Sequence, residues 1–353
     1  MANEILFREG FDTYDGIQPN IGVQSKWIIN ATSSYQTTNG RFGGKALRVD
    51  KGGGTLYPYC RGTLDANSAS DWACGFALRV GVLGATFSAS GFDVRFMGPS
   101  ASFELGLRWS LVGEIEVYRI TASNAGVLLG TTAPSVLIAG EWTYLECECV
   151  MSNTVGEFRI YQDGNPTPVL DLSAIDTINV NSAIRYIDLG CASVTAGPDL
   201  IDFDDMYFKN TATRFGPQRI LTLAVDGDSS PLGWTPLSGT SHYPMVDEMP
   251  ANNTDYIQAS TVGNKDRFTH ANIPGNPLTI NEVNVVCYAQ KNDAATRAID
   301  FGMTSNGIDS SKQWYLQTAW GRNEMPRPLD PDGDVAWTLA KVNSLLGMVE
   351  VTV

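Results

Sequence analysis

The chain is a succession of short runs rich in β-branched and aromatic residues, separated by clusters of Gly, Pro, Asn and Asp. Polar and apolar residues often alternate within these runs: in residues 114–120, Ile115 and Val117 point to the side opposite their polar neighbours. Alternation with period two is typical of antiparallel sheets that bury one face. The pattern predicts an all-β fold of antiparallel, jelly-roll-like β-sandwiches. The clearest runs cover residues 72–82, 92–97, 103–111, 114–122, 142–151 and 157–163.

A change of composition predicts two domains. The segment NTATRFGPQ (210–218) interrupts the strand pattern with small polar residues and a Gly-Pro pair. We therefore predict one β-sandwich over residues 1–210 and a second over residues 211–353. In the second half, strand-like runs return at residues 280–291, 297–305 and 314–322.

Local signals predict several further features. The run at 280–291 is apolar on both faces, which favours a central strand. Asp163-Gly164 predicts a hairpin turn, because Gly tolerates positive φ. Near the C-terminus, DPDGDVAWTLAKVNSLLG predicts a short helix with Asp334 as N-cap and Gly347 at its C′ position, followed by a closing strand.

Charge excludes several classes of partner. The 353 residues include 38 acidic and 24 basic side chains, for a net charge of -14. This balance argues against nucleic acid and against an anionic membrane surface, both of which need clustered Lys and Arg. We expect no membrane insertion, because no apolar run approaches the roughly 18 residues of a spanning helix. The start, MANEILFREGFD, lacks the features of a signal peptide, so we expect a protein made without a secretion signal.

Cysteine and histidine usage predicts no redox or metal centre. No two of the six cysteines have the C-x-x-C spacing of a zinc or redox motif, and we expect buried free thiols. Cys147 and Cys149 should share one face of a strand, at the edge of disulfide reach. The two histidines, His242 and His270, lie in loop-like stretches and are expected to be solvated. No cofactor motif is present, and a Ser-His-Asp site has no local support such as G-x-S-x-G.

One strand invites comparison with glycan hydrolases. Endo-glycanases of the jelly-roll class use acids at i, i+2 and i+5 on one strand, because retaining hydrolysis needs two carboxyl groups about 5 Å apart. Glu114 and Glu116 fit the first two positions loosely, but Arg119 stands where the third acid belongs. We therefore expect a polar sheet face and no enzyme.

Three Asp-rich stretches raise the question of calcium, which prefers hard oxygen ligands. The residues Asp202, Asp204 and Asp205, in LIDFDDMYF, are a candidate structural calcium site, with a hydrogen-bonded turn as the alternative. DPDGD (330–334) lacks the Gly and acid spacing of a helix-loop-helix calcium site and predicts a helix-capping turn. The stretch Asp226-Gly227-Asp228 predicts a turn in the same way.

A series of motifs resembles a known group of proteins. In order, they are FREGFDTYD, GRFGGKALRV, GEWTYLE, FRIYQDG, LDLSAIDT and FDDMYF in the first half. This order resembles the laminin-G or concanavalin-A-like jelly rolls of virion proteins from tailed bacteriophages. The second half, with WTPLSGTSHYPMVDEMP, YAQKNDAATRAIDF and DPDGDVAWT, is similar to the C-terminal β domain of the same phage proteins.

The resemblance implies a virion structural protein, made in the bacterial host and carried on the particle as a head decoration or fibre or as a tail component. Its partners would be other virion proteins, and it would act in many copies or as a homo-oligomer. It brings no catalytic residue with it. A carbohydrate-binding adhesin for host-surface glycans is the alternative, and a glycan hydrolase ranks last.

Overall fold

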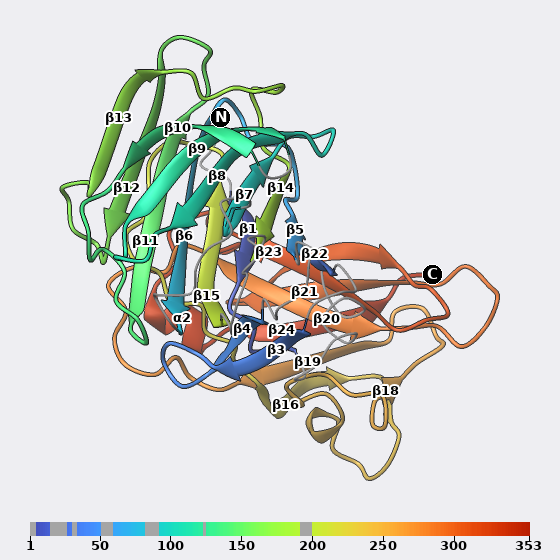
Figure 1. Cartoon of the computed structure of the whole chain (residues 1–353). Helices are drawn as coiled ribbons and strands as arrows, with labels where there is room; N and C mark the ends of the chain where they lie inside the picture. Colours follow the sequence, from blue (N-terminus) through green and yellow to red (C-terminus); the bar gives the residue numbers. More distant parts are fainter. Residues whose placement is uncertain are drawn as a thin grey trace. The chain divides into compact units, whose positions relative to one another are not determined.

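The computed structural model describes residues 5–14, 27–29, 34–50, 59–81, 92–122, 125–190 and 200–353. The chain divides into two compact units, Met1–Ile220 and Leu221–Val353 (Figure 1). Almost all regular structure in the described residues is antiparallel β, with one short α-helix near the C-terminus. The predicted all-β class is therefore confirmed.

Two large sheets form the first unit (Figure 1). Sheet A has the order β13 (Leu170–Ile175), β12 (Gly156–Gln162), β11 (Trp142–Val150), β6 (Asp71–Val80), β15 (Leu200–Lys209), β4 (Lys45–Asp50) and β3 (Ser34–Asn39), and β1 (Ile5–Glu9) also pairs with β15. Sheet B has the order β10 (Ala125–Thr131), β9 (Ile115–Ala122), β8 (Phe103–Trp109), β7 (Val94–Met97), β14 (Tyr186–Leu189), β5 (Cys60–Thr63) and β2 (Trp27–Ile29).

The two sheets share one apolar core. At its centre the Trp72 ring of sheet A lies 4.7 Å from the Phe96 ring of sheet B and 5.1 Å from the Phe208 ring. Each fully buried side chain of this size contributes roughly 1.5–3 kcal/mol. The alternation predicted from the sequence is confirmed, because Ile115 and Val117 enter this core.

Cysteines contribute to the core as free thiols. Cys74, Cys147 and Cys149 are buried free thiols, as predicted, whereas Cys287 is only partly buried. Cys60 is also buried, and Cys191 lies outside the described residues. Burial raises the pKa of the Cys149 thiol well above its ordinary value, which keeps it protonated and unreactive.

Residues 210–220, here called the strap, belong to the first unit. The strap follows β15 and binds the face of sheet A that points away from the core, through hydrogen bonds to Glu146, Glu148 and Asp205. These bonds explain why the division falls after Ile220, whereas the sequence places the boundary after residue 210.

The second unit contains smaller sheets (Figure 1). Its five-stranded sheet has the order β16 (Val225–Leu232), β19 (Lys265–His270), β24 (Leu346–Val351), β21 (Ala298–Ser305) and β22 (Ile308–Tyr315). Two strand pairs accompany it, β17 (Thr235–Pro236) with β18 (Ile257–Gln258), and β20 (Val283–Ala289) with β23 (Gly321–Arg327). The 3₁₀ turn η1 covers Tyr243–Met245 and the helix α2 covers Leu339–Asn343.

Strand predictions in this unit need two corrections. The predicted central strand, now β20, pairs with β23 alone in a two-stranded sheet. It is apolar on both faces for another reason: Val283 and Val285 pack on the core around Met303, while Tyr288 stacks on Trp320. The run at 314–322 is not one strand, since it spans the end of β22 and the start of β23.

The predicted turn and helix ends also differ. Asp226-Gly227-Asp228 lies within strand β16, where the strand bulges, instead of forming a turn. The N-cap of α2 is Thr338, whose hydroxyl accepts from the Lys341 amide at 3.3 Å, and not Asp334. Gly347 lies in β24, so it caps no helix.

Among the described residues, no helix has both the length and the apolar character needed to span a bilayer.

Candidate binding face on the N-terminal sandwich

The face of sheet B that points away from the core, here called the outer face, brings charged and aromatic side chains into one row. Core residues such as Ile187 and Leu189 point inward, so their neighbour Asp188 points outward. Strand register then places one outward residue of each strand side by side. From one edge of the sheet to the other the row is Ile28, Arg61, Asp188, Arg95, Gly106, Tyr118 and Leu128.

Asp188 is the centre of a buried ion-pair cluster in this row. Its carboxylate accepts from Arg61 Nε at 2.6 Å and Arg61 Nη2 at 2.8 Å. Arg95 Nη2 donates to the same carboxylate at 3.0 Å. Asp188 is fully buried and the Arg95 side chain is only 5% exposed. A bidentate pair of this kind fixes the position of both groups, because breaking it would leave a buried charge without compensation.

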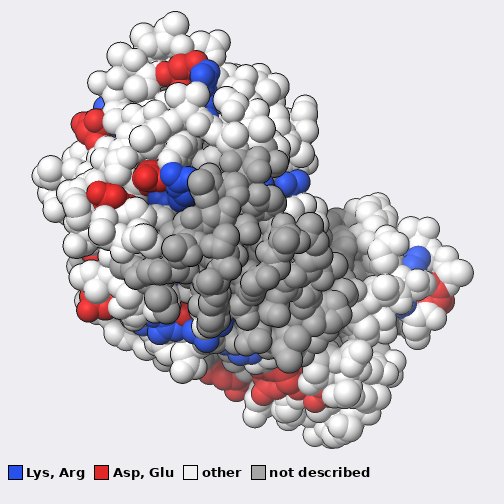
Figure 2. Space-filling view, in the orientation of Figure 1, with Lys and Arg blue, Asp and Glu red and all other residues white. Residues whose placement is uncertain are grey.

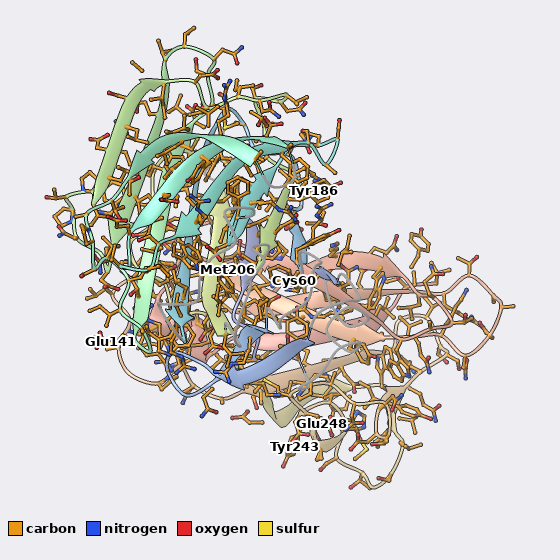
Figure 3. The ribbon with its side chains drawn as sticks, in the orientation of Figure 1. Cys60, Glu141, Tyr186, Met206, Tyr243 and Glu248 are labelled. Atoms are coloured by element: carbon orange, nitrogen blue, oxygen red, sulfur yellow. The ribbon has the colours of Figure 1, made fainter. Side chains whose placement is uncertain are left out.

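Aromatic rings flank the cluster. The Arg61 guanidinium lies 4.9 Å from the Tyr59 ring and 5.2 Å from the Tyr186 ring. Arg95 lies 5.2 Å from the Phe103 ring. Figure 3 shows Tyr186 on β14, with Cys60 marking the neighbouring strand β5. Cation–π contacts add to the ion pairs in holding the guanidinium groups in place.

Glu116 belongs to a second polar cluster, on strands β8 and β9. Arg108 Nε donates to its carboxylate at 2.6 Å, and the Tyr118 hydroxyl donates to the same oxygen at 2.9 Å. Arg108 also donates to the Tyr118 hydroxyl. Burial, and then the bond to Glu116, raise the pKa of Tyr118 to about 12, so this phenol stays protonated.

Apolar contacts fill the space between the two clusters. Phe92, Tyr118 and Ile120 pack together on the outer face, with the Phe92 and Tyr118 rings 5.4 Å apart. Gly106 lies beneath them, since a Cβ at this position would come within 2.8 Å of both Ile120 and Phe92. The outer face therefore combines a charged end with an aromatic, apolar centre.

The two acids singled out from the sequence lie at this face but have separate partners. Glu114 accepts from the Ser110 hydroxyl at 2.9 Å in the turn before β9, whereas Glu116 is held by Arg108 and Tyr118. Arg119, at the position of the expected third acid, forms an ion pair with Asp176. The charged side chains of the predicted polar sheet face are thus paired with one another or with neighbouring hydroxyl groups.

Of the three candidate calcium ligands, Asp202 differs from the other two because it is paired with two arginines. Its carboxylate accepts from Arg48 Nε at 2.7 Å and from Arg79 Nη2 at 2.6 Å. Two guanidinium groups already neutralise this side chain, which is 3% exposed.

Asp204 and Asp205 form an acidic pair at a β-bulge, where Asp205 has a φ of 50°. Asp204 accepts from the Arg41 amide at 2.8 Å, and Asp205 accepts from the Ile220 amide at 2.7 Å. Burial, followed by the charge of Asp205, raises the pKa of Asp204 to about 7. Burial also raises the pKa of Asp205 to about 6.

The structure does not gather the three aspartates into one ligand set. Within the described part of the chain, no three His, Cys, Asp or Glu side chains converge as a metal site would require. Calcium at Asp202, Asp204 and Asp205 stays a prediction.

The DPDGD stretch forms a hydrogen-bonded turn. In it, Asp330 accepts from the Asp332 amide at 3.0 Å, and Lys341 pairs with Asp332. Where Figure 2 draws described residues, acidic and basic side chains lie in small groups among uncharged ones.

The solvated position predicted for His242 is wrong. His242 is 6% exposed, and its Nδ1 lies 2.5 Å from Oδ2 of the fully buried Asp266. The other oxygen of Asp266 accepts from the Gly233 and Trp234 amides at 2.6 and 2.9 Å. Asp266 thus ties the loop that carries His242 to strands β16 and β19. His270 is half-buried, with Nδ1 2.9 Å from the Ala271 carbonyl.

Sequence reasoning missed the Arg61, Asp188 and Arg95 cluster. Arg61 and Asp188 are 127 positions apart, so no local motif contains them. The signal that could have found them is a charged residue flanked by apolar residues in a short strand, as in YIDL and VRFM.

Comparison with known proteins gives no family: no family model and no curated protein match this chain. Solved structures with a similar arrangement include the cellulose-induced protein Cip1, at 16% identity and a TM-score of 0.37, covering 54% of this chain and 93% of that protein. Lectin I from Ulex europaeus, in complex with a fucose glycoside, has 10% identity and a TM-score of 0.38, covering 58% and 98%. The alginate lyase vAL-1 from Chlorella virus has 14% identity and a TM-score of 0.38, covering 52% and 93%. At these values the likenesses establish no shared function.

Proposed function

We propose that this protein is a structural component on the surface of a tailed-bacteriophage particle, where it acts through protein–protein contacts. The observation that carries a structural role is the pairing of buried carboxylates within the fold. Asp188 is held by two arginines, Asp202 by two others, and Glu146 by the strap. Carboxylates committed in this way fix the shape of both sheet faces.

The phage setting rests on the ordered motifs that run through both halves of the sequence. The net charge of -14 fits this role, since it keeps free subunits soluble before assembly and repels them from nucleic acid.

The test is the protein content of purified particles from the phage that encodes this chain. We expect the chain to remain with the particles through density-gradient centrifugation, in many copies per particle, while non-structural phage proteins are removed. Loss of the chain together with those proteins would contradict the proposal.

Glycan binding at the outer face of sheet B is the second candidate. It is favoured by the two partly exposed rings of Tyr59 and Tyr186, which flank the Arg61 guanidinium that Asp188 holds in place. Sugar sites pair rings that stack on a pyranose with a few oriented polar groups that bind its hydroxyls. Binding to host-surface glycans on an array, with and without calcium, should weaken in Tyr186→Ala and persist in Tyr315→Ala. The ring of Tyr315 is 55% exposed in the second unit and serves as the control.

Glycan hydrolysis ranks last. Release of reducing ends from host polysaccharide, abolished by Glu116→Gln, would revive it. We expect no release by either protein, because Glu116 is tied to Arg108 and Tyr118.

A further inference from the structure

Strand β10 ends sheet B as an unpaired, apolar edge. Within the described residues it pairs with β9 alone, leaving the backbone groups of its other side without a strand partner. Residues Ala125, Gly126, Val127 and Leu128 are all exposed, with Val127 at 47% and Leu128 at 50%. An edge of this kind is a template for another strand.

Three other edge strands, β13 of sheet A and β16 and β22 of the five-stranded sheet, are better protected, whereas the edge strands β2 and β3 also contain no charged residue. Edge strands usually carry charges or prolines that prevent pairing with another chain. Here β13 contains Asp171, β16 contains Asp228 and Pro231, and β22 contains Lys312. In contrast, residues 121–140, which include β10, contain no Asp, Glu, Lys or Arg.

The absence of charge in this segment points to a second copy of the same chain as the occupant. Two copies with a net charge of -14 repel each other, and a contact through an uncharged edge brings no like charges close together. A partner of opposite charge would instead be matched by acidic side chains along the edge, and β10 has none.

Local geometry fits a two-fold contact. Register shifts between Ala125 and Gly126 and between Leu128 and Gly130 leave Gly126–Leu128 as the regular stretch. If a two-fold axis passes beside Val127, antiparallel pairing places Val127 opposite its own copy and Gly126 opposite Leu128. Gly126 has no side chain to collide with Leu128, and a two-fold contact of this kind is self-complementary.

We propose that β10 is the self-association edge of this protein, where two copies pair antiparallel and join their B sheets into one continuous sheet. This inference is independent of the phage role and of glycan binding, because it concerns the isolated chain.

The experiment is sedimentation velocity and light scattering on the full chain between about 1 and 100 μM. We expect a dimer in the unmodified protein and a monomer in Leu128→Lys, with a circular dichroism spectrum that is unchanged because the fold is kept. The matched control is Val155→Lys, which adds the same charge at a residue 67% exposed elsewhere in the first unit and should remain dimeric. A monomer throughout the range in the unmodified protein would overturn the proposal.

Cross-linking then tests the register. In Val127→Cys, a short thiol cross-linker should give a covalent dimer, because residues opposite each other in paired strands have Cβ atoms about 5 Å apart. Val155→Cys and the unmodified chain should give none. A dimer that survives Leu128→Lys, or that does not cross-link at Val127→Cys, uses another surface and would refute pairing through β10.

Discussion

Asp188 of β14 lies directly opposite Arg61 of β5, and both of its carboxylate oxygens accept hydrogen bonds from that one guanidinium group. Arg95 approaches the same carboxylate from the other neighbouring strand. The arrangement joins β5, β14 and β7 through side chains as well as through their backbone ladders.

Asp188→Asn should destabilise the first unit by about 3 kcal/mol, because it removes the negative charge from a buried ion-pair cluster that two guanidinium groups share. Urea unfolding, followed by tryptophan fluorescence, measures this loss. The control is Asp171→Asn: Asp171 also pairs with an arginine, but its side chain is 55% exposed, and such surface pairs contribute about 0–1 kcal/mol. Equal effects from the two variants would contradict the role given to the Asp188 cluster.

Loss of the Arg214 side chain should loosen the strap. Arg214 Nη1 donates to Glu146 at 2.8 Å, and Glu146 is 1% exposed. Among the described residues, Arg214→Ala leaves that carboxylate with the Tyr207 hydroxyl and the Gly216 amide as hydrogen-bond donors. We expect a loss of about 2–3 kcal/mol, since one partner of a buried pair is removed, and faster proteolysis within residues 210–220.

Limited proteolysis with mass spectrometry locates the cleavage sites. Arg297→Ala provides the comparison, because Arg297 is 41% exposed in its pair with Asp293. Cleavage of the strap at the same rate in both variants would mean that Arg214 does not hold it.

The acidic pair at the β-bulge should make stability depend on pH. The pKa of Asp204, raised to about 7, and that of Asp205, raised to about 6, lie above their ordinary value of 3.8. The folded state therefore binds these protons more tightly than the unfolded state. The stability that protonation of Asp204 and Asp205 contributes is fully present below about pH 4 and is lost as the pH rises through about 7.

Asp204→Asn removes this dependence at one position, although one backbone donor loses its acceptor. We therefore compare the free energy of unfolding of the variant with that of the unmodified protein at each pH. This difference should shift by about 2 kcal/mol in favour of the variant between pH 5 and pH 8. Chemical unfolding at the two pH values measures this difference. Asp334→Asn, at a side chain 77% exposed, should show no such change. If the stability of Asp204→Asn relative to the unmodified protein decreases from pH 5 to pH 8, the raised pKa of Asp204 is contradicted.

Gly106 should tolerate no side chain, because its Cβ would come within 2.8 Å of Ile120 and Phe92. Gly106→Val should cost about 1–3 kcal/mol through overpacking. Gly347→Ala, where a Cβ meets nothing within 4 Å, should change stability by less than about 0.5 kcal/mol. Thermal unfolding of both variants provides the comparison, and equal melting temperatures would show that the outer face can adjust around residue 106.

Sequence patterning predicted the strands of the first unit well because alternation has a direct physical cause there. Ile115 and Val117 face the core, and Asp163 and Gly164, with φ of 49° and 78°, turn the chain between the paired strands β12 and β13. The same reasoning failed for the polar side of β11. Glu146 alternates as a solvated residue would, yet the strap buries it through contacts nearly 70 positions away.

The remaining errors have the same origin in long-range contacts. His242 lies in a loop by composition, but the carboxylate of Asp266, 24 positions later, draws it into the interior. The Arg61, Asp188 and Arg95 cluster depends on strand order in sheet B, where β14 separates β5 from β7. Strand order is set by the whole fold, so local spacing does not reveal which charges meet.

The strap also has a mechanical consequence. It lies in the chain between the last strand of the first sandwich and the beginning of the second unit. A pull along the chain from the second unit therefore loads the bonds of Ile220, Gly216 and Arg214 in succession before it loads the end of β15 at Lys209. Because the bonds at Asp205 and Glu146 must rupture one after another, the strap spreads the tension over two strands of sheet A, β15 and β11, before the end of β15 is peeled away.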